Sequence, residues 1–342
     1  MALLADLDGK EILFTWGLFG VQSGNVTEEE SPIVSTLHQL SAGSAQRVDH
    51  LQDENHVSKQ QNPRTTIFVA YWLHHREYLT WNEKVFLPFW NGLPDDAGVW
   101  REVMRVPKSR YMFSTSSPKP SGFATLVGTK LSKDAGYWKV YRHRMSQTPD
   151  QYTTPGDTFT SPYSSEPSAS RPEKKLVDLE TKYPDEIQSG RVKITKIPDN
   201  LCFCREVQAQ PDLPQKELEI WREQLNPYFR SWVDHLDTHH NKNGIISFST
   251  HVASKLEDDA APEADQLMYF LDLESFELSG RSFKDHVKLR NKTMGLYGPG
   301  GELSGRGKLH LMVELCILKS DDLDAEYIGC KKGTRLMILE DL

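Results

Sequence analysis

The sequence of 342 residues has little cysteine, no excess of basic residues and no long apolar run. Its 4 cysteines are too few for a disulfide-stapled scaffold, and none forms a Cys-x-x-Cys pair. Lys and Arg number 40 against 48 Asp and Glu, a formal net charge of −8, which argues against phosphate-backbone binding as the main function. We therefore expect a reducing, cytoplasmic environment and no nucleic-acid partner.

A secretory signal pattern is missing from the first residues, and no stretch approaches the roughly 18 apolar residues of a membrane span. Aromatic residues are plentiful instead: 14 Phe, 12 Tyr and 8 Trp. They supply the apolar area of a substantial core, which disordered chains lack. We expect a folded protein without a membrane span, built as one large domain or as two fused halves.

Two polar segments interrupt the periodic parts of the chain. Residues 41–64 are rich in Gln, Asp and Ser, and residues 146–172 are mostly Ser, Thr and Pro. Such compositions bury too little apolar surface to offset the entropy of ordering. Both segments are predicted to be surface loops.

The remaining elements occur in two similar sets about 200 residues apart. In each set a strand precedes a buried strand, an amphipathic helix follows, and a further strand comes later. Strands are predicted at 14–22, 66–73, 99–106 and 111–114, and again at 244–250, 266–273 and 308–318. Helices are predicted at 78–89, 218–236 and 276–289, with Pro227 kinking or restarting the second. The pattern predicts an α+β fold in which helices cover one face of antiparallel sheets.

A predicted strand at 200–206 carries the most informative polar residue. Strand alternation places Cys202, Cys204 and Glu206 on one face. The two thiols favour a core or pocket wall. A carboxylate directed into an apolar interior must be paired or have a raised pKa, and either is typical of a functional site.

Two other groups of residues are ambiguous. His235 and His239 have the spacing of helical metal ligands, but the glutamate of a metalloprotease motif and a third ligand are missing, which favours a structural role. Residues 136–144, GYWKVYRHR, are dense in aromatics and cations. They form either a strand or turn with cation-π contacts, or a segment that points one Arg inward to bind a polar substrate group.

Residues 136–144 resemble a segment of the haem-containing aldoxime dehydratases, lyases that convert aldoximes to nitriles. Similar segments follow in the same order over most of the chain: FGVQ at 19–22, FVAYW at 68–72, Asp199-Asn200, and the block at 308–334. The resemblance implies a duplicated ferredoxin-like repeat, a dimeric α+β barrel. It implies one composite domain over 1–342, with an N-terminal half at about 10–145, a loop insertion at about 146–175 and a C-terminal half at about 190–342.

The family's functional residues are only partly present. The resemblance places the catalytic Arg at Arg144, but Glu206 stands at the position of the catalytic Ser and Val313 at that of the distal His. The haem-ligand His is expected near 290–293, where the sequence has none; His286 is the nearest. His310 has the opposite strand parity to Val313 and is expected to face away.

These differences lead to the hypothesis of a pocket without any cofactor. Arg144 and Glu206 are its candidate catalytic residues, and the candidate substrate-binding residues are Cys202, Cys204, Leu311, Val313 and Trp138. The expected function is a cofactor-independent lyase or cyclase on a hydrophobic small molecule of specialised metabolism, through an elimination or a Diels-Alder-type ring closure. The alternatives are a haem b-dependent aldoxime dehydratase with His286 as a relocated ligand, and a non-catalytic binding homologue. A homodimer is left open.

Overall fold

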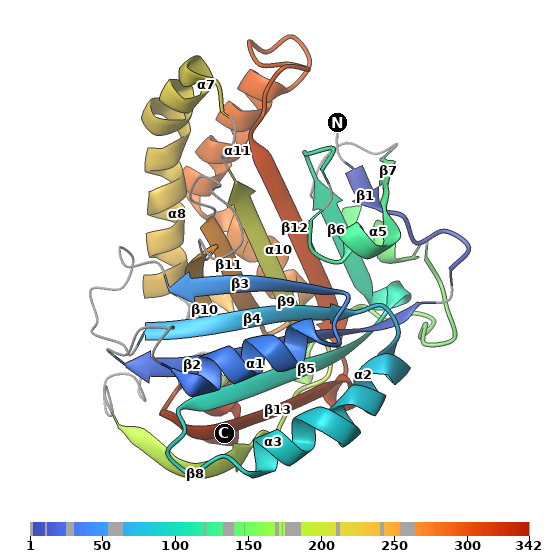
Figure 1. Cartoon of the computed structure of the whole chain (residues 1–342). Coiled ribbons are helices and arrows are strands. Elements are labelled where there is room, and N and C mark those ends of the chain that lie inside the picture. The colour runs from blue at the N-terminus through green and yellow to red at the C-terminus, as the bar shows by residue number, and fades with distance from the viewer. Residues whose placement is uncertain are drawn as a thin grey trace.

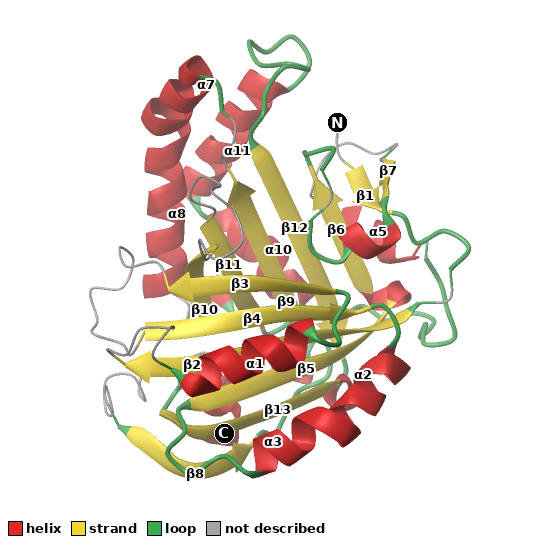
Figure 2. Cartoon of the chain, viewed as in Figure 1, coloured by secondary structure: helices red, strands yellow, loops and turns green. Residues whose placement is uncertain are grey.

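The computed structural model shows a large antiparallel sheet with helices against its outer surfaces (Figures 1 and 2). It describes residues 3–10, 12–24, 31–53, 64–119, 121–132, 140–146, 148–167, 171–172, 174, 186–209, 213–239, 243–253 and 264–341. The strands are β1 (Leu3–Ala5), β2 (Leu13–Gly24), β3 (Arg47–Asp53), β4 (Arg64–Trp72), β5 (Val99–Pro107), β6 (Tyr111–Thr115), β7 (Thr129–Leu131), β8 (Ile187–Lys193), β9 (Leu201–Ala209), β10 (Ile245–Ala253), β11 (Ala264–Phe270), β12 (His310–Leu318) and β13 (Leu323–Lys331).

The main helices follow the strands in two groups. The first comprises α1 (Pro32–Ala42), α2 (His75–Trp81), the π-helical turn η2 (Asn82–Phe86) and α3 (Leu87–Asn91). The second comprises α7 (Gln215–Ile220), the π-helical turn η6 (Trp221–Leu225), α8 (Asn226–Thr238), α10 (Leu273–Ser282) and α11 (Lys284–Tyr297). The short α4 (Ala124–Val127) and α5 (Val140–Ser146) lie between the groups in sequence.

The 13-stranded sheet has the order β7-β1-β6-β12-β9-β11-β10-β3-β4-β2-β5-β13-β8. All its pairs are antiparallel. We call the strands from β6 to β10 the C-terminal half-sheet and those from β3 to β13 the N-terminal half-sheet; they meet at the β10–β3 pair. The predicted α+β class with an antiparallel sheet is confirmed, and each strand predicted from periodicity is present to within a few residues, whereas β1, β3, β7, β8 and β13 were not predicted.

The inner faces of the two half-sheets pack against each other around two buried glutamates, Glu102 of β5 and Glu314 of β12. Each glutamate accepts hydrogen bonds from one tyrosine of each half-sheet, at 2.5–3.0 Å: Tyr269 and Tyr327 on Glu102, and Tyr71 and Tyr111 on Glu314. Arg335 also contacts Glu102 at 2.9 Å. Buried carboxylates persist only with such partners, so these bonds fix how the half-sheets pack.

The outer faces carry the helices. We call the outer face of the N-terminal half-sheet, with α1, α2, η2 and α3, the N-terminal layer, and the outer face of the C-terminal half-sheet, with α5, α8, α10 and α11, the C-terminal layer (Figure 1). The N-terminal layer is rich in aromatic rings, whereas the C-terminal layer combines aromatic rings with aliphatic, sulfur-containing and polar side chains.

Pro227 restarts a helix as predicted. It lies in the first turn of α8, directly after the π-helical turn η6. Proline has no backbone donor and crowds the preceding turn, so the wider π turn accommodates it and α8 begins with proline in its preferred place. Pro88 has the same relation to η2 and α3 in the other layer.

Two local predictions are wrong. Part of the segment predicted as a polar loop at 41–64 is strand β3, whose Asp49 forms a buried ion pair with Arg205 at 2.6 Å. This pairing across the sheet offsets a composition that favours a loop locally. Within 136–144, the strand-or-turn interpretation fails for the described residues, which form α5. The described residues of 148–167 are loop except for a short 3-10 turn, as predicted, and none of the described helices is long and apolar enough for a membrane crossing.

Candidate active site

Strand β9 presents the predicted set of residues to the C-terminal layer. Cys202 and Cys204 pack with Met268, Leu315 and other apolar side chains of that layer, and Glu206 follows on the same face. Burial raises the pKa of both thiols well above the usual range. They are therefore neutral wall residues at pH 7 rather than nucleophiles.

Glu206 is the unusual residue of this face. It is partly exposed, and it makes no side-chain hydrogen bond or ion pair with the described residues. Burial raises its pKa to about 7. A carboxyl group that is half protonated near neutral pH can both donate and accept a proton, which is the property of a general acid or base.

The neighbours of Glu206 follow from strand register. Val313 of β12 pairs with it on one side and Gln266 of β11 on the other. Val313 is buried and Leu311, two residues earlier, is partly exposed, so both lie on the outer face with Glu206. His310 has inner-face parity, as predicted.

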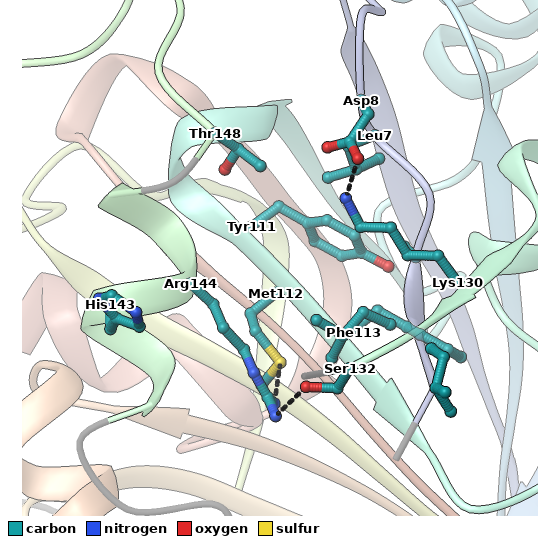
Figure 3. A pocket seen from close by; sticks show the side chains of 13 residues that line it. Leu7, Asp8, Tyr111, Met112, Phe113, Lys130, Ser132, His143, Arg144 and Thr148 are labelled. Atoms are coloured by element: carbon teal, nitrogen blue, oxygen red, sulfur yellow. Dashed lines mark hydrogen bonds and ion pairs between the residues drawn. The ribbon is translucent and has the colours of Figure 1, made fainter. Parts of the chain in front are cut away.

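Arg144 lines a separate cavity at the sheet edge. It belongs to α5, is 6% exposed, and lines a cavity of about 510 Å³ bordered by β1, β6, β7 and α5 (Figure 3). Its guanidinium donates long hydrogen bonds to Met112 Sδ at 3.8 Å and Ser132 Oγ at 3.5 Å. Lys130 and Asp8 form an ion pair across the same cavity. Sequence reasoning missed Met112, Ser132, Lys130 and Asp8 as lining residues. The elements β1, β7 and α5, which border the cavity, are too short to show a periodic pattern.

Met112 contacts Arg144, and the strand register from Met112 gives the distance to Glu206. Met112 of β6 pairs with Leu315 of β12, which pairs with Cys204 of β9, two residues before Glu206 on the same face. With strands about 4.8 Å apart and alternate residues about 6.8 Å apart along a strand, the backbones of Met112 and Glu206 are about 12 Å apart. The two predicted catalytic residues thus flank one face without touching. Trp138 lies outside the described residues.

The helix α11 carries His286. Its Nδ1 lies 2.6 Å from the Gly280 carbonyl oxygen and its ring 4.4 Å from that of Trp232. Because a carbonyl only accepts, Nδ1 carries the proton and the lone pair is on Nε2. Burial lowers the pKa of His286, which keeps the ring neutral at pH 7. No described residue of α11 is fully buried, although the helix contacts α8 and α10.

His235 and His239, the pair with helical metal-ligand spacing, lie on and directly after α8. Their rings stack on each other at 4.7 Å, and His235 stacks on Phe283 at 3.9 Å. The described residues contain no cluster of three His, Cys, Asp or Glu suited to hold a metal ion. The stacking gives both histidines a packing role between α8 and the start of α11.

Comparison with known proteins identifies the family. Residues 17–336 match the family described as haem-containing dehydratase. This chain belongs to the haem-containing dehydratase family. Two crystal structures of dehydratases share its fold at 18% identity: an aldoxime dehydratase, with a TM-score of 0.76 over 98% of this chain and 90% of the other, and aldoxime dehydratase OxdRE in complex with butyraldoxime, with 0.73 over 98% and 88%. No curated protein matches the sequence.

The prediction of a cofactor-free protein is therefore wrong, because the family is haem-containing. That prediction depended on the missing His at 290–293. One helical turn earlier, α11 does carry an imidazole, His286, and residues four apart share a helix face.

His286 has the chemistry of a haem ligand. A neutral imidazole whose other ring nitrogen is held by a backbone carbonyl is the usual arrangement of a metal-bound histidine. The protonated thiols of Cys202 and Cys204 are poor donors by comparison. Among the described residues of the C-terminal layer, the imidazole of His286 and the two neutral thiols thus fit a haem held through one histidine.

Proposed function

We propose that this protein is a haem-dependent lyase that removes water from a hydrophobic aldoxime, with Arg144 and Glu206 acting on the substrate. Membership of the haem-containing dehydratase family supports the reaction class, and the names of the two structural relatives suggest the substrate class. The observation that carries the proposal is Glu206, an unpaired carboxyl with a pKa of about 7 among apolar side chains.

Dehydration of an aldoxime breaks the N–O and C–H bonds and forms a nitrile and water. In the proposed reaction, protonated Glu206 donates its proton to the hydroxyl oxygen, which leaves as water. The resulting carboxylate then accepts the proton lost from carbon, so the carboxyl group is regenerated. A pKa near the working pH suits one group to both steps.

Arg144 has a different role in this proposal. Its guanidinium stays protonated at all working pH values and is a fixed hydrogen-bond donor. Its hydrogen bonds to Met112 and Ser132 are long, so a substrate oxygen can replace these bonds at little cost. We assign Arg144 to binding a second polar group of the substrate, on the far side of this face from Glu206.

Haem, when bound, supplies a Lewis-acidic iron for an uncharged substrate atom. Among the described residues, His286 would hold it. The thiols, Val313 and Leu311 provide an apolar wall beside Glu206.

We also propose that the two layers are ferredoxin-like repeats within one composite domain. The order β2-α1-β3-β4-α2-α3-β5 and the order β9-α7-α8-β10-β11-α10-α11-β12 support a duplication. The proposed halves span about 10–145 and 190–342, with the insertion at 146–175 between them. The homodimer and the Diels-Alder-type ring closure stay predictions from the sequence.

Haem binding and nitrile formation test the proposal together. The protein reconstituted with haem is expected to show a Soret band at one haem per chain and to convert a hydrophobic aldoxime such as phenylacetaldoxime to its nitrile. His286→Ala should lose the haem, whereas His235→Ala, which removes a neighbouring stacked ring, should keep it. Glu206→Gln should keep haem and lose at least about tenfold in turnover. Haem binding without any nitrile, or full activity of Glu206→Gln, would contradict the proposal.

A further inference from the structure

The C-terminal layer contains a patch of polar side chains that the proposed reaction does not use. Thr250 of β10 pairs with Gln266 of β11, and Gln266 pairs with Glu206 of β9, so the three side chains lie in one row across three strands. Gln208 of β9 lies next to this row on the same face. We call Thr250, Gln266 and Gln208 the polar patch; Glu206, which acts in the proposed reaction, lies beside it.

Polar atoms of the patch lack hydrogen-bond partners among the described residues. Gln266 is 1% exposed, and neither its amide nitrogen nor its amide oxygen has a hydrogen-bond partner among the described residues. The Thr250 hydroxyl, 9% exposed, and the Gln208 amide oxygen also have none. Buried polar groups in folded proteins are almost always hydrogen-bonded, because each orphan destabilises the fold. Several adjacent orphans on one face indicate a partner that the described residues do not provide.

The partly exposed side chains beside the polar patch belong to the central strand β9. Glu206 and Gln208 are both partly exposed although β9 is flanked by β11 and β12 and the layer is covered by α8 and α11. On the β12 side their cross-strand neighbours, Val313 and Leu311, are apolar, and Gln208 pairs with Ala264 of β11. A ligand that enters over β9 therefore meets an apolar surface with one hydrogen-bonding patch.

The chemistry of the polar patch selects an uncharged ligand group. Gln266 offers one N–H donor and one carbonyl acceptor in a single plane, which matches the acceptor and donor of a carboxamide through two parallel hydrogen bonds. On this face the described part of the patch has no Lys or Arg to bind an anion, and Glu206 opposes one. A cation would find one carboxyl group that is only partly ionised.

We propose that the polar patch binds an amide group of the substrate, held by Gln266 and flanked by Thr250 and Gln208. This inference rests on the proposed function, because it adds a second functional group to the hydrophobic substrate of the same site. Gln266 and Thr250 are binding residues in it, not catalytic ones. A substrate with an amide would be preferred over a purely hydrocarbon aldoxime.

Calorimetric binding of three probes of similar size tests the inference without any turnover. Benzamide offers a donor and an acceptor, acetophenone only an acceptor, and benzoate a negative charge. Benzamide is expected to bind about tenfold more tightly than acetophenone, the equivalent of roughly one good hydrogen bond, with benzoate weakest. None of the probes carries an N–OH group, so inactivity towards aldoximes leaves this result unaffected.

Gln266→Met separates recognition from a structural role. The variant keeps the volume of the side chain and removes both polar atoms, so it should bind acetophenone unchanged and lose the preference for benzamide. Gln22→Met is the matched control, because Gln22 is satisfied by Thr334 and Lys331 far from this face. An unchanged preference in Gln266→Met, equal weakening of all three probes, or no preference in the wild type would overturn the inference.

Discussion

Strand β2 of the N-terminal layer and strand β9 of the C-terminal layer occupy equivalent positions but carry different kinds of side chain on their outer faces. Leu18 pairs with Glu102 and Arg205 pairs with Glu314, so the next residues, Phe19 and Glu206, occupy corresponding outer positions. Phe19 packs against three aromatic rings at 5.1–6.3 Å: Trp72, Trp81 and Phe86. Glu206 has no partner among the described residues. In the N-terminal layer this position carries a packed ring that stabilises the fold. In the C-terminal layer it carries a carboxyl group that we propose acts on a ligand.

The same contrast holds beside these positions. Gly17 precedes Phe19 by two residues, and a Cβ there would come within 2.8 Å of the Phe19 ring and 3.2 Å of the Trp72 ring. The glycine therefore makes room for the aromatic cluster. Its counterpart in the C-terminal layer is Cys204, a small side chain whose cross-strand neighbours are Met268 and Leu315. Rings surround Phe19 in the first layer, whereas Cys204 in the second has non-aromatic neighbours on both adjacent strands.

The largest expected difference between the layers is in stability. Phe19→Ala should lower the free energy of unfolding by about 3–5 kcal/mol, because it opens a cavity among rigid rings. Glu206→Ala should not lower it, since the carboxyl has no described partner to lose and its ionisation in the folded protein is unfavourable. Denaturant unfolding at pH 7, followed by circular dichroism, measures both. Equal losses would mean that the two outer faces are equally filled.

Strands were easier to predict than sites, for a physical reason. β4 and β11 are runs of apolar and β-branched residues whose local pattern determines their structure. The face of Glu206 also followed from alternation, because Cys202 and Cys204 fix the parity of β9. Strand β3 could not be predicted from its local pattern, because its Asp49 is stabilised by Arg205, which is far away in sequence.

Gln266 shows the limit of sequence reasoning more clearly. Its parity with Met268 and Phe270 predicts a buried side chain, and that was the only available signal. Whether a buried amide is satisfied depends on neighbouring strands, and the β10–β11–β9 register cannot be read from one strand. For the same reason the axial role of His286 could not be weighed until its contact with Gly280 was known.

The second prediction concerns pH. A carboxyl whose pKa is higher in the folded protein binds its proton more tightly there, so its contribution to stability is largest at low pH and falls as the pH rises from 4.5 to about 7. The full shift corresponds to about 3 kcal/mol, and the partial exposure of Glu206 reduces the expected loss to about 2 kcal/mol.

Unfolding of the wild type and of Glu206→Gln from pH 4.5 to 8 measures this loss. The variant should become relatively more stable as the pH rises, because its neutral amide has no proton to release. Glu223→Gln, a change at an exposed glutamate on η6, is the control and should follow the wild type. Parallel pH profiles for the wild type and Glu206→Gln would mean that Glu206 finds a partner in solution.

The smallest expected effect is an increase in the free energy of unfolding on substitution of a buried residue. Gln266→Met should raise the free energy of unfolding by about 1 kcal/mol, because it removes two unsatisfied polar atoms and keeps a side chain of similar size in an apolar layer. Gln22→Met should lower it by about the same amount, since Gln22 donates to Thr334 at 2.9 Å and accepts from the Lys331 backbone at 3.0 Å. Thermal unfolding in the absence of ligand compares the two variants directly. Opposite signs would show that the C-terminal layer gives up stability at Gln266 to keep a binding group. If both variants were destabilised equally, Gln266 would be an ordinary core residue, and the two layers would differ only in their aromatic content.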